Sequence, residues 1–146
     1  MPKEILEIRT RSEKETFELG YRISHELKPG DTISLEGDLG TGKTALTKGI
    51  AAGLGISKPI TSPTFTLVNS YAGKCILNHF DVYRVDDPDE LLEIGWEEYL
   101  SDDAICIVEW GDRISEILPE NTIHIRLERD NEDADSRIIF IERLTI

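Results

Sequence analysis

A glycine-rich segment, Gly37-Asp38-Leu39-Gly40-Thr41-Gly42-Lys43-Thr44, matches the pattern G-x-x-x-x-G-K-[ST] at every defined position. It follows Asp31–Glu36, which is typical of a short strand, and it opens Lys43–Leu54, whose apolar residues recur at helical spacing. A strand, a turn of this kind and a helix, in this order, are typical of a phosphate-binding loop. The segment therefore predicts an α/β fold of the P-loop NTPase class, in which a mixed sheet is flanked by helices.

The residue types in this loop suit the binding of a nucleoside triphosphate. Glycines allow backbone N–H groups to turn inward around phosphate oxygens, and the start of the helix adds the positive end of its dipole. Lys43 is expected to reach the β- and γ-phosphates, and the Thr44 hydroxyl is expected to take one Mg²⁺ position. The predicted nucleotide-binding residues are Gly37, Asp38, Leu39, Gly40, Thr41, Gly42, Lys43, Thr44 and Ala45.

A metal ion beside the phosphates needs a carboxylate, and Glu109 stands where one is expected. It ends the apolar run Ala104–Val108, and a carboxylate at the end of a buried strand points into the crevice that holds the phosphates. Thr44 and Glu109 are therefore the predicted metal ligands, although an acid that merely ends a strand is the alternative reading. Trp110 stands where many P-loop ATPases carry a second acid, so another group must activate water, or hydrolysis must be slow.

Asp81 is the candidate for the missing acid, because it follows the strand-like run Cys75–Phe80. His79 and Asp81 alternate with Phe80 and should face the same side, although a histidine in a strand is more often structural than catalytic. The segment Thr61–Thr64 is either a loop that senses the γ-phosphate or a plain surface turn. The predicted catalytic residues are Lys43, Asp81 and Glu109.

The rest of the pattern predicts a single domain over residues 1–146, with no repeat and no linker. Ser12 and Glu15 match a capping box at the start of a helix. The short connection Ala72-Gly73-Lys74 predicts one antiparallel strand pair, and alternation on both sides of the acidic loop at 130–135 predicts a second. The order of strands in the sheet cannot be read from these patterns. Further strands are expected near 5–8, 65–71, 75–80, 104–108, 122–127 and 137–144, and further helices at 12–27, 87–100 with a break near Gly95, and 113–118.

The composition disfavours several classes of function. The net charge is −13, from 29 acids against 16 bases, without a basic cluster that could grip a nucleic acid directly. Such a surface is either simply solubilising or suited to a basic partner protein. Cys75 and Cys106 lie in strand-like runs without metal-ligand spacing, as in a reducing compartment. No signal peptide and no membrane span of ~18 apolar residues is recognisable, so a cytoplasmic location is expected.

Four segments in this order resemble the TsaE family, also called YjeE. They are the phosphate loop, Ser62-Pro63-Thr64-Phe65-Thr66-Leu67-Val68, His79-Phe80-Asp81-Val82-Tyr83-Arg84 and Val108-Glu109-Trp110. Many families share the first segment, but the other three in this order are highly specific. The resemblance covers the whole chain.

This resemblance implies an ATPase that uses ATP and Mg²⁺ in the pathway that makes N6-threonylcarbamoyladenosine at adenosine 37 of tRNA (t6A37). The implied partners are the TsaD and TsaB proteins, with the transferase chemistry on TsaD and the tRNA contacted only through the partners. By position, the resemblance places Mg²⁺ on Thr44 and Glu109 and gives Asp81 a supporting role toward the metal or the attacking water. It also implies a switch-like loop at Ser62–Thr66, with Trp110 close to the site.

Two other functions stay open. A small-molecule P-loop kinase needs an acceptor pocket and usually several arginines that clamp phosphates, and between Lys43 and Glu109 the chain has only Arg84. A nucleotide-gated interaction module, in which ATP occupancy controls docking, is the non-enzymatic alternative. A GTPase is disfavoured because no [NT]-K-x-D motif occurs. The adenine site is not located by sequence; the segments Thr10–Ser12 and the loop before Arg137 are its candidate neighbours.

Overall fold

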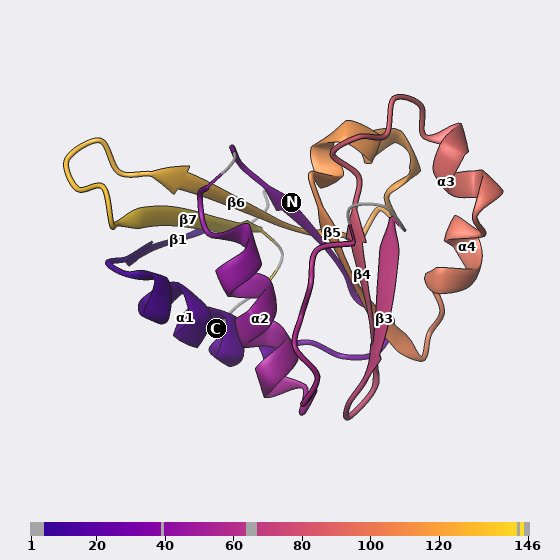
Figure 1. Ribbon diagram of the computed structural model, residues 1–146. Helices are drawn as coiled ribbons and strands as arrows, with labels where there is room; N and C mark the ends of the chain where they lie inside the picture. Colours follow the sequence, from indigo (N-terminus) through magenta and orange to yellow (C-terminus); the bar gives the residue numbers. More distant parts are fainter. Residues whose placement is uncertain (1–4, 39, 64–66, 143, 145–146) are drawn as a thin grey trace.

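The computed structural model describes residues 5–38, 40–63, 67–142 and 144. They contain a seven-stranded sheet in the order β1-β7-β6-β2-β5-β4-β3 (Figure 1). The four central strands run parallel, while β1, β7 and β3 run antiparallel to their neighbours. The strands are β1 (Ile5–Thr10), β2 (Thr32–Glu36), β3 (Val68–Ala72), β4 (Ile76–Asp81), β5 (Ala104–Glu109), β6 (Ile123–Arg129) and β7 (Arg137–Glu142).

Helices cover the two faces of this sheet unequally. The helices are α1 (Glu13–Ser24), α2 (Lys43–Gly53), α3 (Asp89–Glu93) and α4 (Trp96–Tyr99), with a 3₁₀ helix, η1, at Gly111–Ile117. In Figure 1, α1 and α2 lie side by side against one face, and α3 and α4 lie at the β3–β4 end on the opposite side. The expected α/β fold of the P-loop class, with a mixed sheet flanked by helices, is confirmed.

Alternation along the central strands separates two apolar clusters. Leu77, Ile105 and Ile107 pack with residues of α1 and α2. Phe80 and Val108, at the intervening positions, pack instead with residues of α3, α4 and η1. In strands buried on both faces, every position is apolar or paired, and all six residues of β5 are buried.

The α1–α2 contact is unusually close because glycines form it. A methyl group at Gly20 would lie 2.3 Å from the Leu46 carbonyl oxygen, and one at Gly49 would lie 2.0 Å from the Phe17 carbonyl oxygen. Both distances are far below van der Waals contact. The two helices therefore pack backbone against backbone.

Most expected elements are present, with shifted ends. Ser12 caps α1 by accepting a hydrogen bond from the Glu15 N–H at 3.1 Å, as the capping box predicts. The helix ends at Ser24 rather than Leu27, because the following turn tightens into i→i−3 bonds such as Leu27 N–H to Ser24 O. The helix expected over 87–100 is divided into α3 and α4 by Gly95, whose φ of +87° is left-handed.

Two expectations, for the start of β3 and for the helix after β5, need correction. The strand expected from Phe65 begins at Val68, and residues 64–66 lie outside the described part of the chain. Leu67 has a φ of +67°, which no strand residue adopts. The helix expected over 113–118 is η1, interrupted at Ile114, where the backbone is not helical. Within the described residues, no helix has the length and apolar character needed to cross a membrane.

Candidate functional site

The phosphate loop joins β2 to α2 in a conformation that its glycines permit. Gly42 precedes α2 with a φ of +102°, and Gly37 has a φ of +137°. A side chain at Gly37 would lie 2.4 Å from the Leu127 carbonyl oxygen, because the loop passes directly against β6. Thr41 closes the turn by donating from Oγ1 to the Asp38 carbonyl oxygen at 2.8 Å. Leu39 lies outside the described residues.

Lys43 points back into this loop. Its Nζ donates to the carbonyl oxygens of Gly37 and Asp38, the latter at 2.8 Å, and lies 4.0 Å from the centroid of the Trp110 ring. Burial lowers the pKa of Lys43 from 10.5, and the negative charges of Glu109 and Asp38 partly offset this effect. Burial thus disfavours the charged ammonium, and a phosphate bound beside it would favour the charged form.

The two predicted acids lie at the same edge of the sheet. Asp81 and Glu109 are paired in register at the ends of β4 and β5, and Leu35 of β2 is the other neighbour of Glu109. This is the carboxyl edge of the parallel strands, where open α/β sheets bind ligands. Asp81 is half-buried and accepts hydrogen bonds from the Tyr83 N–H at 3.0 Å and from Ser62 Oγ at 3.3 Å.

Glu109 is almost fully buried, at 5% exposure. Its Oε2 lies 2.6 Å from Nε2 of His79, which precedes Asp81 by two residues on β4. The expected alternation is confirmed, because Phe80 packs in the cluster on the other face.

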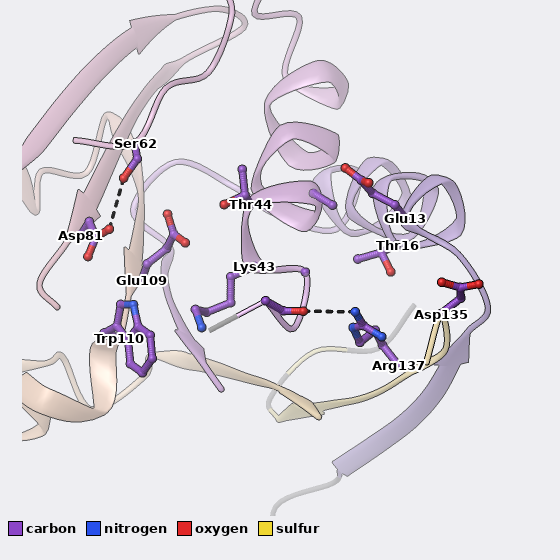
Figure 2. Close-up of a pocket in the computed structure, with 13 residues that line it drawn as sticks. Glu13, Thr16, Lys43, Thr44, Ser62, Asp81, Glu109, Trp110, Asp135 and Arg137 are labelled. Atoms are coloured by element: carbon purple, nitrogen blue, oxygen red, sulfur yellow. Dashed lines mark hydrogen bonds between the residues drawn. The ribbon is translucent and has the colours of Figure 1, made fainter. Parts of the chain in front are cut away.

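A cavity of about 490 Å³ opens beside the loop (Figure 2). The predicted residues that it brings together are Gly40, Gly42, Lys43, Thr44, Ala45, Asp81 and Glu109. Gly37, Asp38 and Thr41 instead line a second hollow on the β6 side of the loop. Ser62 reaches the first cavity, whereas Thr64 lies outside the described residues. Arg84 is exposed and is not among the described residues that line it.

Four further residues line this cavity that no sequence motif indicates. Glu13 and Thr16 come from the first turns of α1, and Asp135 and Arg137 come from the hairpin between β6 and β7. They lie next to the two segments named as candidate neighbours of adenine. Arg137 donates from Nη2 to the Gly40 carbonyl oxygen at 3.1 Å. A contact between residues so far apart in the chain leaves no local sequence signal.

Trp110 also lines the cavity, as the resemblance implies. Its φ of +65° is uncommon for a bulky residue. A hydrogen bond from its N–H to the Leu35 carbonyl oxygen at 2.8 Å fixes the backbone. The Tyr83 ring lies 4.8 Å from the Trp110 ring, centroid to centroid. The indole is thereby held beside Lys43, and a strained backbone at such a place is typical of functional sites.

The residues around the cavity fit a magnesium–nucleotide ligand. Thr44 is exposed at its rim and Glu109 and Asp81 add carboxylate oxygens, which are the ligands that Mg²⁺ prefers. The described residues include no group of three or more His, Cys, Asp or Glu side chains arranged to hold a metal ion. Magnesium in phosphate-transfer sites commonly takes one or two protein ligands and completes its shell with water and phosphate oxygens.

Comparison with known proteins shows the family to which the chain belongs. Residues 10–139 match the family model described as threonylcarbamoyl adenosine biosynthesis protein TsaE. The tRNA threonylcarbamoyladenosine biosynthesis protein TsaE of Bacillus subtilis is 43% identical over 129 residues, covering 88% of this chain and 80% of that protein. Its namesake from Treponema pallidum is 42% identical, covering 81% and 87%.

A solved structure has the same fold. The crystal structure of Bacillus subtilis YdiB superposes with a TM-score of 0.84 at 36% sequence identity, covering 99% of this chain and 89% of that one. The family model spans residues 10–139 and therefore includes the positions of Lys43, Asp81 and Glu109. The chain therefore belongs to the TsaE family.

Proposed function

We propose that this chain binds ATP with Mg²⁺ and hydrolyses it slowly, in support of t6A37 modification of tRNA by a complex of TsaB and TsaD. One observation carries the nucleotide part of the proposal. Lys43, Thr44, Asp81 and Glu109 line one cavity at the carboxyl edge of the parallel strands. The pathway and partners rest on family membership, because the relatives are named for threonylcarbamoyladenosine biosynthesis.

Each side chain has a role in this proposal. Lys43 neutralises the β- and γ-phosphates, and its interaction with them is strengthened because the side chain is buried. Thr44 and Glu109 hold Mg²⁺, which when bound shields the phosphate charges and orients the γ-phosphate. Asp81, held by Ser62 and the Tyr83 N–H, orients water or supports the metal. The hydrogen bond between Asp81 and Ser62 links this site to the loop that contains Ser62.

Slow hydrolysis follows from what lines the cavity. Trp110 follows Glu109 in place of a second acid. The one arginine among the described lining residues, Arg137, is engaged with Gly40. In other P-loop enzymes, an arginine supplied by a partner accelerates hydrolysis ~10³–10⁵-fold. The TsaB–TsaD complex is proposed to complete the site. The proposal also includes a cytoplasmic location and a single domain over residues 1–146.

Steady-state ATP hydrolysis tests this proposal. Turnover is expected to be slow for the chain alone and to rise markedly with TsaB and TsaD. It is expected to stay unchanged with tRNA alone, because a chain of net charge −13 without a basic cluster binds a polyanion poorly. Glu109→Gln is expected to keep nucleotide and to lose Mg²⁺-dependent hydrolysis, because the amide keeps the size and removes the charge. Wild-type turnover in this variant would move the metal role to Asp81.

The same assay separates the alternatives. Fast turnover by the isolated chain, or phosphorylation of an added small-molecule acceptor, would establish the kinase. Nucleotide-dependent docking to TsaB and TsaD without stimulated hydrolysis would establish the nucleotide-gated interaction module.

A further inference from the structure

One short polar contact in the candidate site joins two buried side chains on neighbouring strands. His79 of β4 and Glu109 of β5 meet through Nε2 and Oε2 at 2.6 Å, and their side chains are 1% and 6% exposed. In the register of the two strands, His79 lies opposite Ile107 and Asp81 lies opposite Glu109. His79 therefore lies on the same face of the sheet as Asp81 and Glu109, two residues before Asp81 along β4.

His79 does not touch the space that a nucleotide would fill. It is not among the described residues that line the cavity, whereas Glu109 is (Figure 2). Behind it lie apolar side chains, since Leu77 and Ile107 are fully buried. A polar ring in such surroundings is costly unless it is hydrogen-bonded. Any effect of His79 on chemistry must pass through Glu109.

The other ring nitrogen indicates the state of this histidine. Among the described residues, Nδ1 of His79 is buried without a hydrogen-bond partner. A buried N–H without an acceptor is more costly than a lone pair without a donor, because carbonyl and imine acceptors are left unsatisfied more often than N–H groups. The proton of a neutral imidazole therefore belongs on Nε2, where it faces the carboxylate.

A competing position for the Glu109 carboxylate lies close by. The Glu109 charge is the strongest favourable charge acting on Lys43. Direct pairing of the two would engage the ammonium needed for phosphate and the carboxylate needed for the metal. In the structure, Lys43 instead bonds to loop carbonyls, and Glu109 bonds to His79.

We propose that His79 is a positioning residue for Glu109. Its Nε2–H holds Oε2, keeps the carboxylate away from Lys43 and leaves the second oxygen, Oε1, to face the metal position. This inference rests on the proposed function, in which Glu109 binds Mg²⁺. Groups that orient a metal ligand from behind typically change metal affinity about 10–100-fold when they are removed.

The test compares substitutions of His79 that place a hydrogen-bond donor at different distances along the side chain. The amide nitrogen of His79→Gln reaches the place of imidazole Nε2, whereas that of His79→Asn reaches only the place of Nδ1. The measured quantity is the ratio of the dissociation constants of a non-hydrolysable ATP analogue without and with Mg²⁺. His79→Ala and His79→Asn are expected to reduce this ratio about tenfold, and His79→Gln is expected to restore most of it.

The chain offers a matched control in a second histidine–glutamate pair. His124 Nδ1 lies 2.8 Å from Glu36 Oε2 on the face of the sheet away from α1 and α2. His124→Ala should leave the Mg²⁺ ratio unchanged. A merely structural His79 would lower the thermal unfolding midpoint without changing the ratio. A folded His79→Ala variant with the wild-type ratio of dissociation constants would overturn the inference.

Glu109→Gln separates this inference from the proposed function. If Glu109→Gln keeps the wild-type ratio, the metal role of Glu109 fails, and the positioning role of His79 fails with it. If Glu109→Gln loses the ratio and His79→Ala keeps it, only the positioning role fails. Should His79→Ala not fold, ¹⁵N chemical shifts of the wild-type histidines decide the matter. An Nε2–H tautomer supports the inference, and an Nδ1–H tautomer overturns it.

Discussion

Arg137 holds the phosphate loop by donating from Nη2 to the carbonyl oxygen of Gly40 at 3.1 Å. Its other terminal nitrogen, Nη1, donates to the carbonyl oxygens of Ala134 and Ser136 at 2.7 and 2.9 Å. One guanidinium thus ties the turn before β7 to the loop that is expected to receive the phosphates.

We expect Arg137→Ala to weaken binding of an ATP analogue by about tenfold, because a hydrogen bond to a charged group contributes roughly 1.5–3 kcal/mol. Calorimetric titration measures this. Arg126→Ala is the matched control, since Arg126 packs over the Phe140 ring, away from the first cavity. Equal affinities of the two variants would contradict a role for Arg137 in shaping the loop.

Lys43→Ala is expected to abolish productive binding of the ATP analogue almost completely. Lys43 is the cation that the loop itself supplies to the β- and γ-phosphates. The control is Lys48→Ala on the same helix, where the side chain is exposed. Unchanged calorimetric affinity in Lys43→Ala would remove this residue from the site.

The pH dependence of nucleotide affinity reports on the same ammonium. The pKa of Lys43 lies below 10.5 because of burial, and phosphate binds its protonated form. Affinity should therefore be constant at pH values below that pKa and should fall as the pH rises through it. The fall begins at a lower pH than for an exposed lysine. An affinity that stays flat up to pH 10.5 would contradict the assignment.

Local patterns predicted this site well where its parts are continuous in sequence. The loop from Gly37 to Thr44 carries its own geometry in its glycines, and Glu109 is marked by the buried strand that it ends. Both are therefore visible without a structure. The register of β4 against β5 is a tertiary property, so the His79–Glu109 hydrogen bond could be found only from coordinates.

The strand order shows the same limit on a larger scale. The hairpin of β6 and β7 was predicted from alternation, yet β6 pairs with β2 in parallel across a long stretch of chain. That pairing brings Leu127 against Gly37 and brings Arg137 to Gly40. No periodicity within β6 specifies its neighbour, because apolar packing against α1 and α2 is the same for several strand orders.

The two cysteines should differ in reactivity. Burial raises the pKa of the Cys106 thiol to about 11, and Cys106 is 1% exposed. Cys75 is only half-buried, although burial also raises its pKa. At pH 8 a thiol-reactive disulfide should modify only Cys75, slowly, since the thiolate is the reactive form. Both thiols should react in guanidinium, and a Cys75→Ser variant that reacts like wild type would contradict this.

Gly49→Ala should destabilise the fold even though alanine is the better helix former. Helix propensity favours alanine by about 1 kcal/mol, but its methyl group would lie 2.0 Å from the Phe17 carbonyl oxygen. Overpacking of this kind costs about 1–3 kcal/mol or more. Chemical denaturation should show a net loss of stability, with Lys48→Ala as the neutral control. A gain in stability would show that α1 and α2 can separate freely.

The glycine contact also restricts one side of the cavity beside the phosphate loop. It joins α2, which starts with Lys43 and Thr44, to α1, which carries Glu13 and Thr16. These helices form one closely packed wall of the cavity. The segment with Ser62 and the hairpin with Arg137 lie outside that contact. For the proposed nucleotide, we therefore expect entry and release to depend on the Ser62 segment. A partner protein bound to that segment should change the dissociation rate of a fluorescent nucleotide.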